Sequence, residues 1–163
     1  QSAPLRTGSD GKWAINELPE GMDVDAMDGL VERASSAVPG LVRLPLINGF
    51  CYAMRSAVVD AIGPFDEVGF PKGFGEEDDF SMRTPNAGFG IALAQDTYVF
   101  HAKSKSYGSV RRDGLTEAGQ EELRRKHGLP RMKRASATMK ANPYLEAMRE
   151  SVAAELAKRG FTR

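Results

Sequence analysis

Residues 75–83 read GEEDDFSMR, and this stretch decides how the rest of the chain is interpreted. Four consecutive acids, Glu76 to Asp79, directly follow a glycine. Acidic side chains are stabilised in the first turn of a helix, where the backbone N–H groups carry partial positive charge. The stretch therefore predicts a helix that begins at the acids. Asp79 and Arg83 stand four residues apart, a spacing that favours an ion pair on one helical face.

The segments around this helix carry turn signals. The loop FDEVGFPKGFG, residues 65–75, is rich in glycine and aromatic residues, and Asp66 within it is expected to cap or turn the chain. Upstream, Ser56 is expected to cap a short helix that Gly63-Pro64 ends. Downstream, the residues from Asn86 to Gly88 are expected to end the acidic helix.

Extended segments are predicted on both sides of the acidic helix. LVRLPLING over 41–49 has the apolar character of a central strand, although Pro45 counts against a regular ladder position. IALAQ over 91–95 and TYVFH over 97–101 are predicted to be short strands. Cys51 is expected in the core of this region. The single cysteine excludes an internal disulfide framework.

Helices are predicted at both ends of the chain. Apolar residues at helical spacing favour a helix over 23–37. Thr116 is expected to cap a helix that runs to Gly128, where His127 is interpreted as a surface cap, and Pro130 is expected to begin the next. The last helix is predicted to bury one apolar stripe, made of Leu145, Met148, Val152 and Leu156.

Composition places the chain among folded domains. It has 163 residues, of which 41% are hydrophobic and 27% charged, so it can bury a core. No apolar run is long enough to span a bilayer, and no basic and apolar leader opens the chain. A cytoplasmic location is expected, with a peripheral position at the inner membrane face as an alternative. The net charge of zero hides an acidic segment 1–101 and a basic segment 102–163.

Three strings in fixed order carry a family resemblance. LINGFCYAMRSAVVDAIGPFDEVGF begins at residue 46, GFGEEDDFSMR follows, and AGFGIALAQDTYVFHAKSKSYG ends at residue 108. Together they resemble the C-terminal, acceptor-side half of the catalytic domain of family-2 glycosyltransferases, and most closely the rhamnosyltransferase-like bacterial members. A single string of this kind is a weak signal, whereas the ordered set is specific.

The resemblance implies an α/β chain with part of the GT-A fold: a few mixed strands, the acidic helix and a helical C-terminal tail. It divides the chain into a linker or helix region over 1–45, the acceptor-side half over 46–108 and a helical extension over 109–163. The family's donor-binding half does not fit into 45 residues, so it is expected to be cut off or to lie on another polypeptide. Asp23-Val24-Asp25 spells the family's D-x-D metal motif, but a solvated helix face is the favoured interpretation.

The resemblance also places the chemistry on the acids. Inverting glycosyl transfer needs a base for the acceptor hydroxyl, and a carboxylate with a raised pKa can serve. Glu77 is the base if the family pattern is anchored on Arg83, and Asp78 is the base if the motif is read as Glu-Asp. Glu77 is preferred, and both stay open. Glu76 is expected to orient a neighbour or contact the acceptor, and Arg83 to contact substrate. The alternative is an acidic helix cap without chemistry.

Further candidates follow from the same resemblance. His101 is expected to bind Mn²⁺ or Mg²⁺ when the donor-binding half is present. Lys103, Lys105 and Ser106 are expected to close over a diphosphate. Gly49 allows close approach of the donor sugar or the acceptor. Each has a plainer interpretation: a histidine at a strand end, a solvated basic loop and a packing glycine.

Aromatic residues beside the acids are candidates for sugar contacts. Phe70 and Phe74 lie in the loop next to the acidic helix, where aromatic rings could stack on a sugar. Tyr52 is more consistent with core packing.

The implied function is part of a metal-dependent inverting glycosyltransferase. It would move a sugar from a nucleoside-diphosphate sugar to the hydroxyl group of a carbohydrate or lipid-linked acceptor, in bacterial polysaccharide or glycoconjugate assembly. This chain alone is expected to be inactive. The alternative is a non-catalytic α/β binding module whose acidic loop binds a cation or a protein. A glycosidase ranks last, because contiguous acids do not flank a substrate from two sides. Nucleic acid is not an expected partner, whereas peripheral contact of the basic tail with a membrane is considered.

Overall fold

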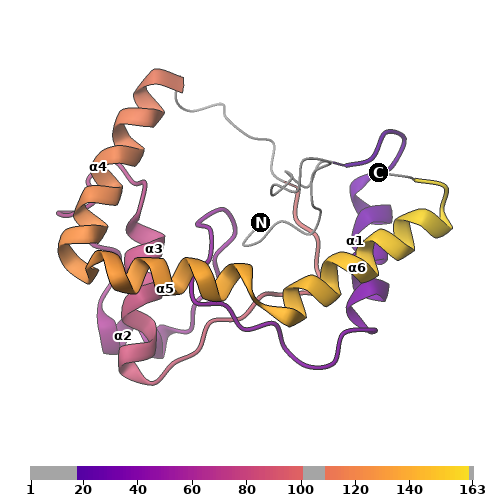
Figure 1. Ribbon diagram of the computed structural model, residues 1–163, viewed down its shortest axis with the longest axis horizontal. Helices are drawn as coiled ribbons and strands as arrows, with labels where there is room; N and C mark the ends of the chain where they lie inside the picture. Colours follow the sequence, from indigo (N-terminus) through magenta and orange to yellow (C-terminus); the bar gives the residue numbers. More distant parts are fainter. Residues whose placement is uncertain (1–17, 101–108, 162–163) are drawn as a thin grey trace. The chain divides into compact units, whose positions relative to one another are not determined.

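A computed structural model describes residues 18–100 and 109–161 of the chain (Figure 1). These residues form two compact units, each assembled from segments that are distant in the sequence. The first unit contains 18–43, 92–100 and 142–161, and the second contains 44–91 and 109–141. None of the helices in these ranges is both long and apolar enough to cross a membrane.

The first unit is a pair of packed helices, α1 (Val24–Ser35) and α6 (Pro143–Lys158), which lie side by side in Figure 1. Asp23 begins α1, because its carboxylate accepts a hydrogen bond from the Ala26 N–H at 2.7 Å. All three residues of Asp23-Val24-Asp25 are exposed at the start of α1, which agrees with the favoured interpretation as a solvated helix face. The predicted apolar stripe of α6 is confirmed, and it is buried together with four residues of α1: Met27, Leu30, Val31 and Ala34.

The second unit contains the acidic helix α3 (Glu76–Arg83) among four further elements: α2 (Ser56–Ile62), η1 (Thr84–Ala87), α4 (Ser109–His127) and α5 (Leu129–Lys140). Helix α3 contacts η1 and α4, and α4 contacts α5. The predicted ends at Gly63, Gly88 and Gly128 are confirmed. The predicted caps are wrong, because Ser56 is already helical and α4 begins well before Thr116.

The predicted α/β architecture with mixed strands is wrong. Residues 18–100 and 109–161 form helices, turns and irregular segments, and their only β features are two isolated bridges. The segment expected as a strand over 41–49 pairs with 91–95 through one bridge, Arg43 to Ala92. The backbone N–H of Leu93 donates to Val42 O at 2.9 Å beside it. Pro45 then removes a donor from the ladder, so the segment stays extended and irregular.

Candidate functional site

Gly75 sets the start of the acidic helix. It is the N-cap residue of α3 and has φ +137°, a conformation that residues with a side chain rarely adopt. A Cβ at this position would also lie 2.9 Å from the ring of Phe70. The Gly75 carbonyl accepts the first helical hydrogen bond, from the Asp79 N–H at 2.9 Å. Gly75 therefore sets where α3 begins and places all four acids in its first turn.

Asp79 is the inward member of the acid run and binds three basic side chains. Its side chain is 0% exposed. Arg83 Nε donates to Oδ2 at 2.8 Å, and Lys126 Nζ lies 2.7 Å from Oδ1. His127 Nε2 lies 2.8 Å from the same Oδ1. Burial alone would raise the pKa of Asp79, but the hydrogen bonds from these three residues outweigh it and hold the pKa below its usual range.

Lys126 connects this network to the loop before α3. Its ammonium also lies 2.7 Å from Oδ2 of Asp66, and burial of the ammonium is outweighed by the two carboxylates, which raise its pKa. The predicted turn at Asp66 is confirmed, because Oδ1 accepts from the N–H groups of Val68 and Gly69 at 3.1 and 2.9 Å. The Lys126 and Gly69 hydrogen bonds lower the pKa of Asp66 to about 2. The network thus joins the loop, α3 and the end of α4.

The other three acids have a different environment. Within the described residues, no Lys, Arg or His forms an ion pair with Glu76, Glu77 or Asp78. Burial, followed by repulsion from Glu77 and Glu76, raises the pKa of Asp78 to about 6. Burial and the charge of Glu77 also raise the pKa of Glu76. One oxygen of Glu77, Oε2, is buried and has no hydrogen-bond partner among the described residues.

Gly49, the predicted point of close approach for a sugar or acceptor, lies beside these acids. A Cβ built on Gly49 would lie 3.5 Å from Cβ and Cδ of Glu77, which is ordinary van der Waals contact. Packing therefore does not require glycine here. The neighbouring turn is held by Asn48, whose Oδ1 accepts from the Phe50 N–H at 3.1 Å. The structure brings Gly49, Glu76, Glu77 and Asp78 into one region.

The Arg83 side chain is held by other groups of the protein. Its guanidinium binds Asp79 and the carbonyl oxygen of Ile62, and donates to Pro64 O at 2.9 Å. These bonds attach α3 to the end of α2 and confirm the predicted ion pair with Asp79. A contact between Arg83 and substrate stays a prediction. The remaining predicted site residues, His101, Lys103, Lys105 and Ser106, lie outside the described residues.

The packing of three further residues confirms one interpretation and corrects two. Tyr52 stacks edge-on against Phe80, with ring centroids 5.9 Å apart, which confirms its place in packing. Phe70, a candidate for stacking on sugar, is buried, and the Lys126 ammonium lies 5.4 Å from its ring centroid. Cys51, expected in the core, is exposed.

Sequence reasoning missed the part that α4 has in the site. His127 was predicted to be a surface cap, but its side chain is 7% exposed and faces Asp79, so that interpretation is wrong. The signal available was a basic helix end, RRKHG, in a chain that also contains a run of four acids. Periodicity cannot show which acid such a helix end meets, because the contact spans 48 residues.

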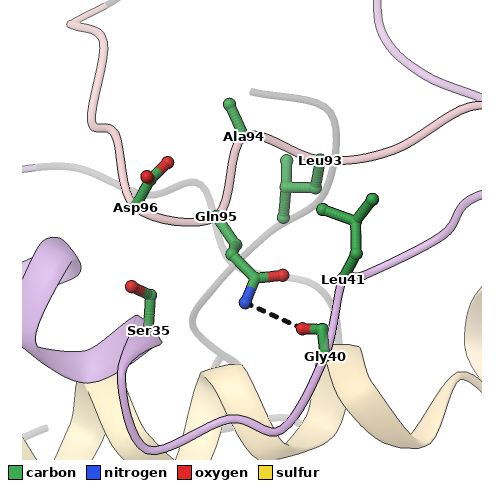
Figure 2. A pocket seen from close by; sticks show the side chains of 7 residues that line it. All are labelled: Ser35, Gly40, Leu41, Leu93, Ala94, Gln95 and Asp96. Atoms are coloured by element: carbon green, nitrogen blue, oxygen red, sulfur yellow. Dashed lines mark hydrogen bonds between the residues drawn. The ribbon is translucent and has the colours of Figure 1, made fainter.

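A shallow hollow of about 290 Å³ lies in the first unit and contains none of the predicted site residues. Figure 2 shows the Gln95 side chain extending toward Gly40, with Nε2 donating to Gly40 O at 3.1 Å. Gln95 Oε1 also accepts from the Val42 N–H at 2.8 Å. Its amide is therefore used to hold two extended segments together. The hydrogen bonds of Gln95 in this hollow are structural, so the acids of α3 remain the candidate site.

The described residues do not fit a metal centre. Over 18–100 and 109–161, no three His, Cys, Asp or Glu residues are arranged to hold a metal ion. Comparison with protein family models, curated proteins and solved structures finds no match to this chain. What the arrangement offers is one structural carboxylate, Asp79, beside carboxylates whose pKa values are raised toward neutrality. Such groups can accept a proton near neutral pH.

Proposed function

We propose that the acidic end of α3 supplies the general base for sugar transfer from a nucleoside-diphosphate sugar to the hydroxyl group of a carbohydrate or lipid-linked acceptor. The proposal rests on the ordered strings that resemble family-2 glycosyltransferases. One observation carries it: the pKa of Asp78 is raised to about 6, and no cation among the described residues neutralises it. The proposal concerns the chemistry of this site and does not require the sheet that was predicted.

The environment of Asp78 suits a base that works near neutral pH. A carboxylate with an ordinary pKa near 4 is too weak a base to take a proton from a hydroxyl group efficiently. Raising the pKa toward 6 strengthens the base while leaving most of it ionised at pH 7. In the proposed step, Asp78 takes the acceptor hydroxyl proton while that oxygen attacks the anomeric carbon and the nucleoside diphosphate departs.

Glu77 and Glu76 support Asp78 in the proposal, because burial and then the charges of both residues raise its pKa. The charge of Glu77 helps to raise the pKa of Asp78, and no group in the described part of the chain donates to its buried Oε2. A sugar hydroxyl could donate to that oxygen. The sequence left Glu77 and Asp78 open as the base, and the raised pKa favours Asp78.

A divalent ion and the donor-binding half belong to the proposal only as expectations. Mn²⁺ or Mg²⁺ would neutralise the departing diphosphate when bound. Its expected ligand, His101, lies outside the described residues, and no described cluster fits a metal. The alternative of a cation-binding module has less support, because the three acids have no arrangement that would surround a cation.

The test combines binding and activity. The chain, alone and joined to a donor-binding half, is titrated with uridine, guanosine and thymidine diphosphate sugars with Mn²⁺ or Mg²⁺. The active form is then assayed for nucleoside diphosphate release between pH 5 and 9. Because the base acts when deprotonated, kcat/KM should rise with pH through about 6 and then level off.

Two substitutions and one control assign the base. Asp78→Asn should lower kcat about 100-fold or more and remove the rise near pH 6. Glu67→Gln, at an exposed acid of the neighbouring loop, should change neither. Full activity in Asp78→Asn with loss in Glu77→Gln would move the base to Glu77. If no form of the protein binds any nucleotide sugar, the transferase proposal is wrong.

A further inference from the structure

Helix α5 presents an outward face that no other described element covers. None of its twelve residues is buried. Its half-buried side contains Arg131, whose guanidinium binds the Met82 carbonyl and donates to Asn86 Oδ1 at 3.1 Å. This side docks on α3 and η1. The opposite side follows helical spacing through Leu129, Lys133 and Lys140, all of which are exposed.

This outward face is strongly basic. Residues 123–145 contain seven Lys or Arg residues and no Asp or Glu. Three of the seven have partners: Arg125 pairs with Glu122, Lys126 with Asp66 and Asp79, and Arg131 with Asn86. The other four are exposed and form no ion pair with a described residue: Arg124, Lys133, Arg134 and Lys140. Arg124 lies on the last turn of α4, and the other three lie along α5.

We propose that this surface, formed by Arg124 and the outward face of α5, binds the anionic surface of a phospholipid bilayer. Clusters of four or more cations on a helix attract anionic headgroups, because each cation near the membrane surface gains electrostatic free energy. The inference goes beyond the proposed transfer reaction and does not require it.

The composition of the face favours lipid over nucleic acid. Its exposed apolar residue is Leu129, which is 42% exposed and followed by exposed Pro130. An aliphatic side chain beside lysines can enter the headgroup boundary while the ammonium groups stay at the phosphates. The face contains no aromatic residue on which a base could stack. A peripheral contact is expected, since no helix in the described ranges can cross the bilayer.

Vesicle co-sedimentation tests the inference without any activity assay, so its outcome is independent of the transferase proposal. The full chain is incubated with vesicles of phosphatidylcholine alone or with half phosphatidylglycerol, at about 0.05 and 0.5 M salt. Binding should require phosphatidylglycerol and weaken at high salt, where the Debye length falls to about 4 Å. Failure to bind phosphatidylglycerol vesicles at low salt would overturn the inference.

Matched charge variants locate the surface. One variant replaces by glutamine the four cations that form no ion pair with a described residue: R124Q, K133Q, R134Q and K140Q. The control makes the same change in net charge at four exposed positions elsewhere: R43Q, R55Q, K72Q and R159Q. Each cation near the surface contributes about five-fold in binding, so the first variant should lose up to a few hundred-fold and the control much less. Equal losses in the two variants would overturn the inference.

A competition experiment separates lipid from nucleic acid. Duplex DNA and single-stranded RNA are added to the vesicle mixture at the phosphate concentration of the lipid. The proposed surface should stay with the vesicles. Transfer of most of the protein to nucleic acid would overturn the inference in favour of a polyphosphate-binding role. Circular dichroism of both variants checks that they fold, which is expected because all eight positions are exposed.

Discussion

Replacing Asp79 by asparagine should destabilise the second unit more than any other conservative change in the acid run. The carboxylate is fully buried and is shared by Arg83, Lys126 and His127 at 2.7 to 2.8 Å. Asparagine keeps the size of the side chain and removes its charge. The amide NH₂ would face at least one of the basic groups, donor against donor. The change therefore isolates the electrostatic and hydrogen-bonding part of the network.

The magnitude follows from burial and from what the three bases retain. Removing one partner of a buried ion pair costs about 3–5 kcal/mol, mostly because the other charge is left without compensation. Here Lys126 keeps Asp66, and Arg83 keeps the carbonyl oxygens of Ile62 and Pro64. These partners place the expected loss near the lower end, at about 3 kcal/mol.

Urea unfolding followed by circular dichroism measures this loss at pH 7. Asp60→Asn is the matched control, because Asp60 is exposed on α2 and forms no ion pair with a described residue. The control should change the free energy of unfolding by less than about 0.5 kcal/mol. A double-mutant cycle with Lys126→Gln should show coupling of about 1 kcal/mol or more. A loss below about 1 kcal/mol in Asp79→Asn, or no coupling, would refute the claim that this network holds α3.

Two further predictions test the packing and the charge of the site. The pKa of Asp78 is raised from 3.8 in the unfolded chain to about 6, so the stability of the wild type should fall as pH rises from 4 through 6. Asp78→Asn should remove this fall. In urea titrations the variant should be more stable than wild type by about 2–3 kcal/mol at pH 8 and should have no such advantage at pH 4. Gly119→Ala should cost about 3 kcal/mol or more, because the new Cβ would overlap the carbonyl oxygen of Phe74. Gly114→Ala in the same helix has open space around it and should gain about 0.5–1 kcal/mol. Equal thermal shifts in the two variants would contradict the close approach of α4 to residue 74.

Local signals in the sequence predicted helices well and strands poorly. Glycine and proline mark the helix ends at Gly63, Gly128 and Pro143, because glycine can adopt the positive φ at which a helix stops and proline has a fixed φ and no N–H. A strand, by contrast, requires hydrogen-bond partners that other segments must supply. The segment 41–49 buries Val42, as an inner strand would, yet it has backbone pairing over only a few residues. Burial could be predicted from its apolar residues, whereas a ladder could not.

The candidate site was predictable in type but not in the division of roles. Acid content and helix position were evident from the sequence, and the Asp79–Arg83 pair followed from spacing. The contribution of Lys126 and His127 depends on how α4 packs against α3, which no local pattern encodes. Cys51 shows the same limit, since its neighbours predicted the core and packing left it exposed.

The four adjacent acids have different environments, and this difference indicates why the chain has an acid at position 78. Helix geometry turns Asp79 inward, where Arg83, Lys126 and His127 contact it, and leaves Asp78 partly buried beside two other acids. For stability alone, asparagine or serine at position 78 would avoid the burial of a charge and the repulsion from Glu77 and Glu76, which together raise the carboxyl pKa. A residue that costs stability at neutral pH is more consistent with a site that uses its charge. If Asp78→Asn stabilises the protein at pH 8 and also stops sugar transfer, the same strain that weakens the fold would be what makes the carboxylate a base.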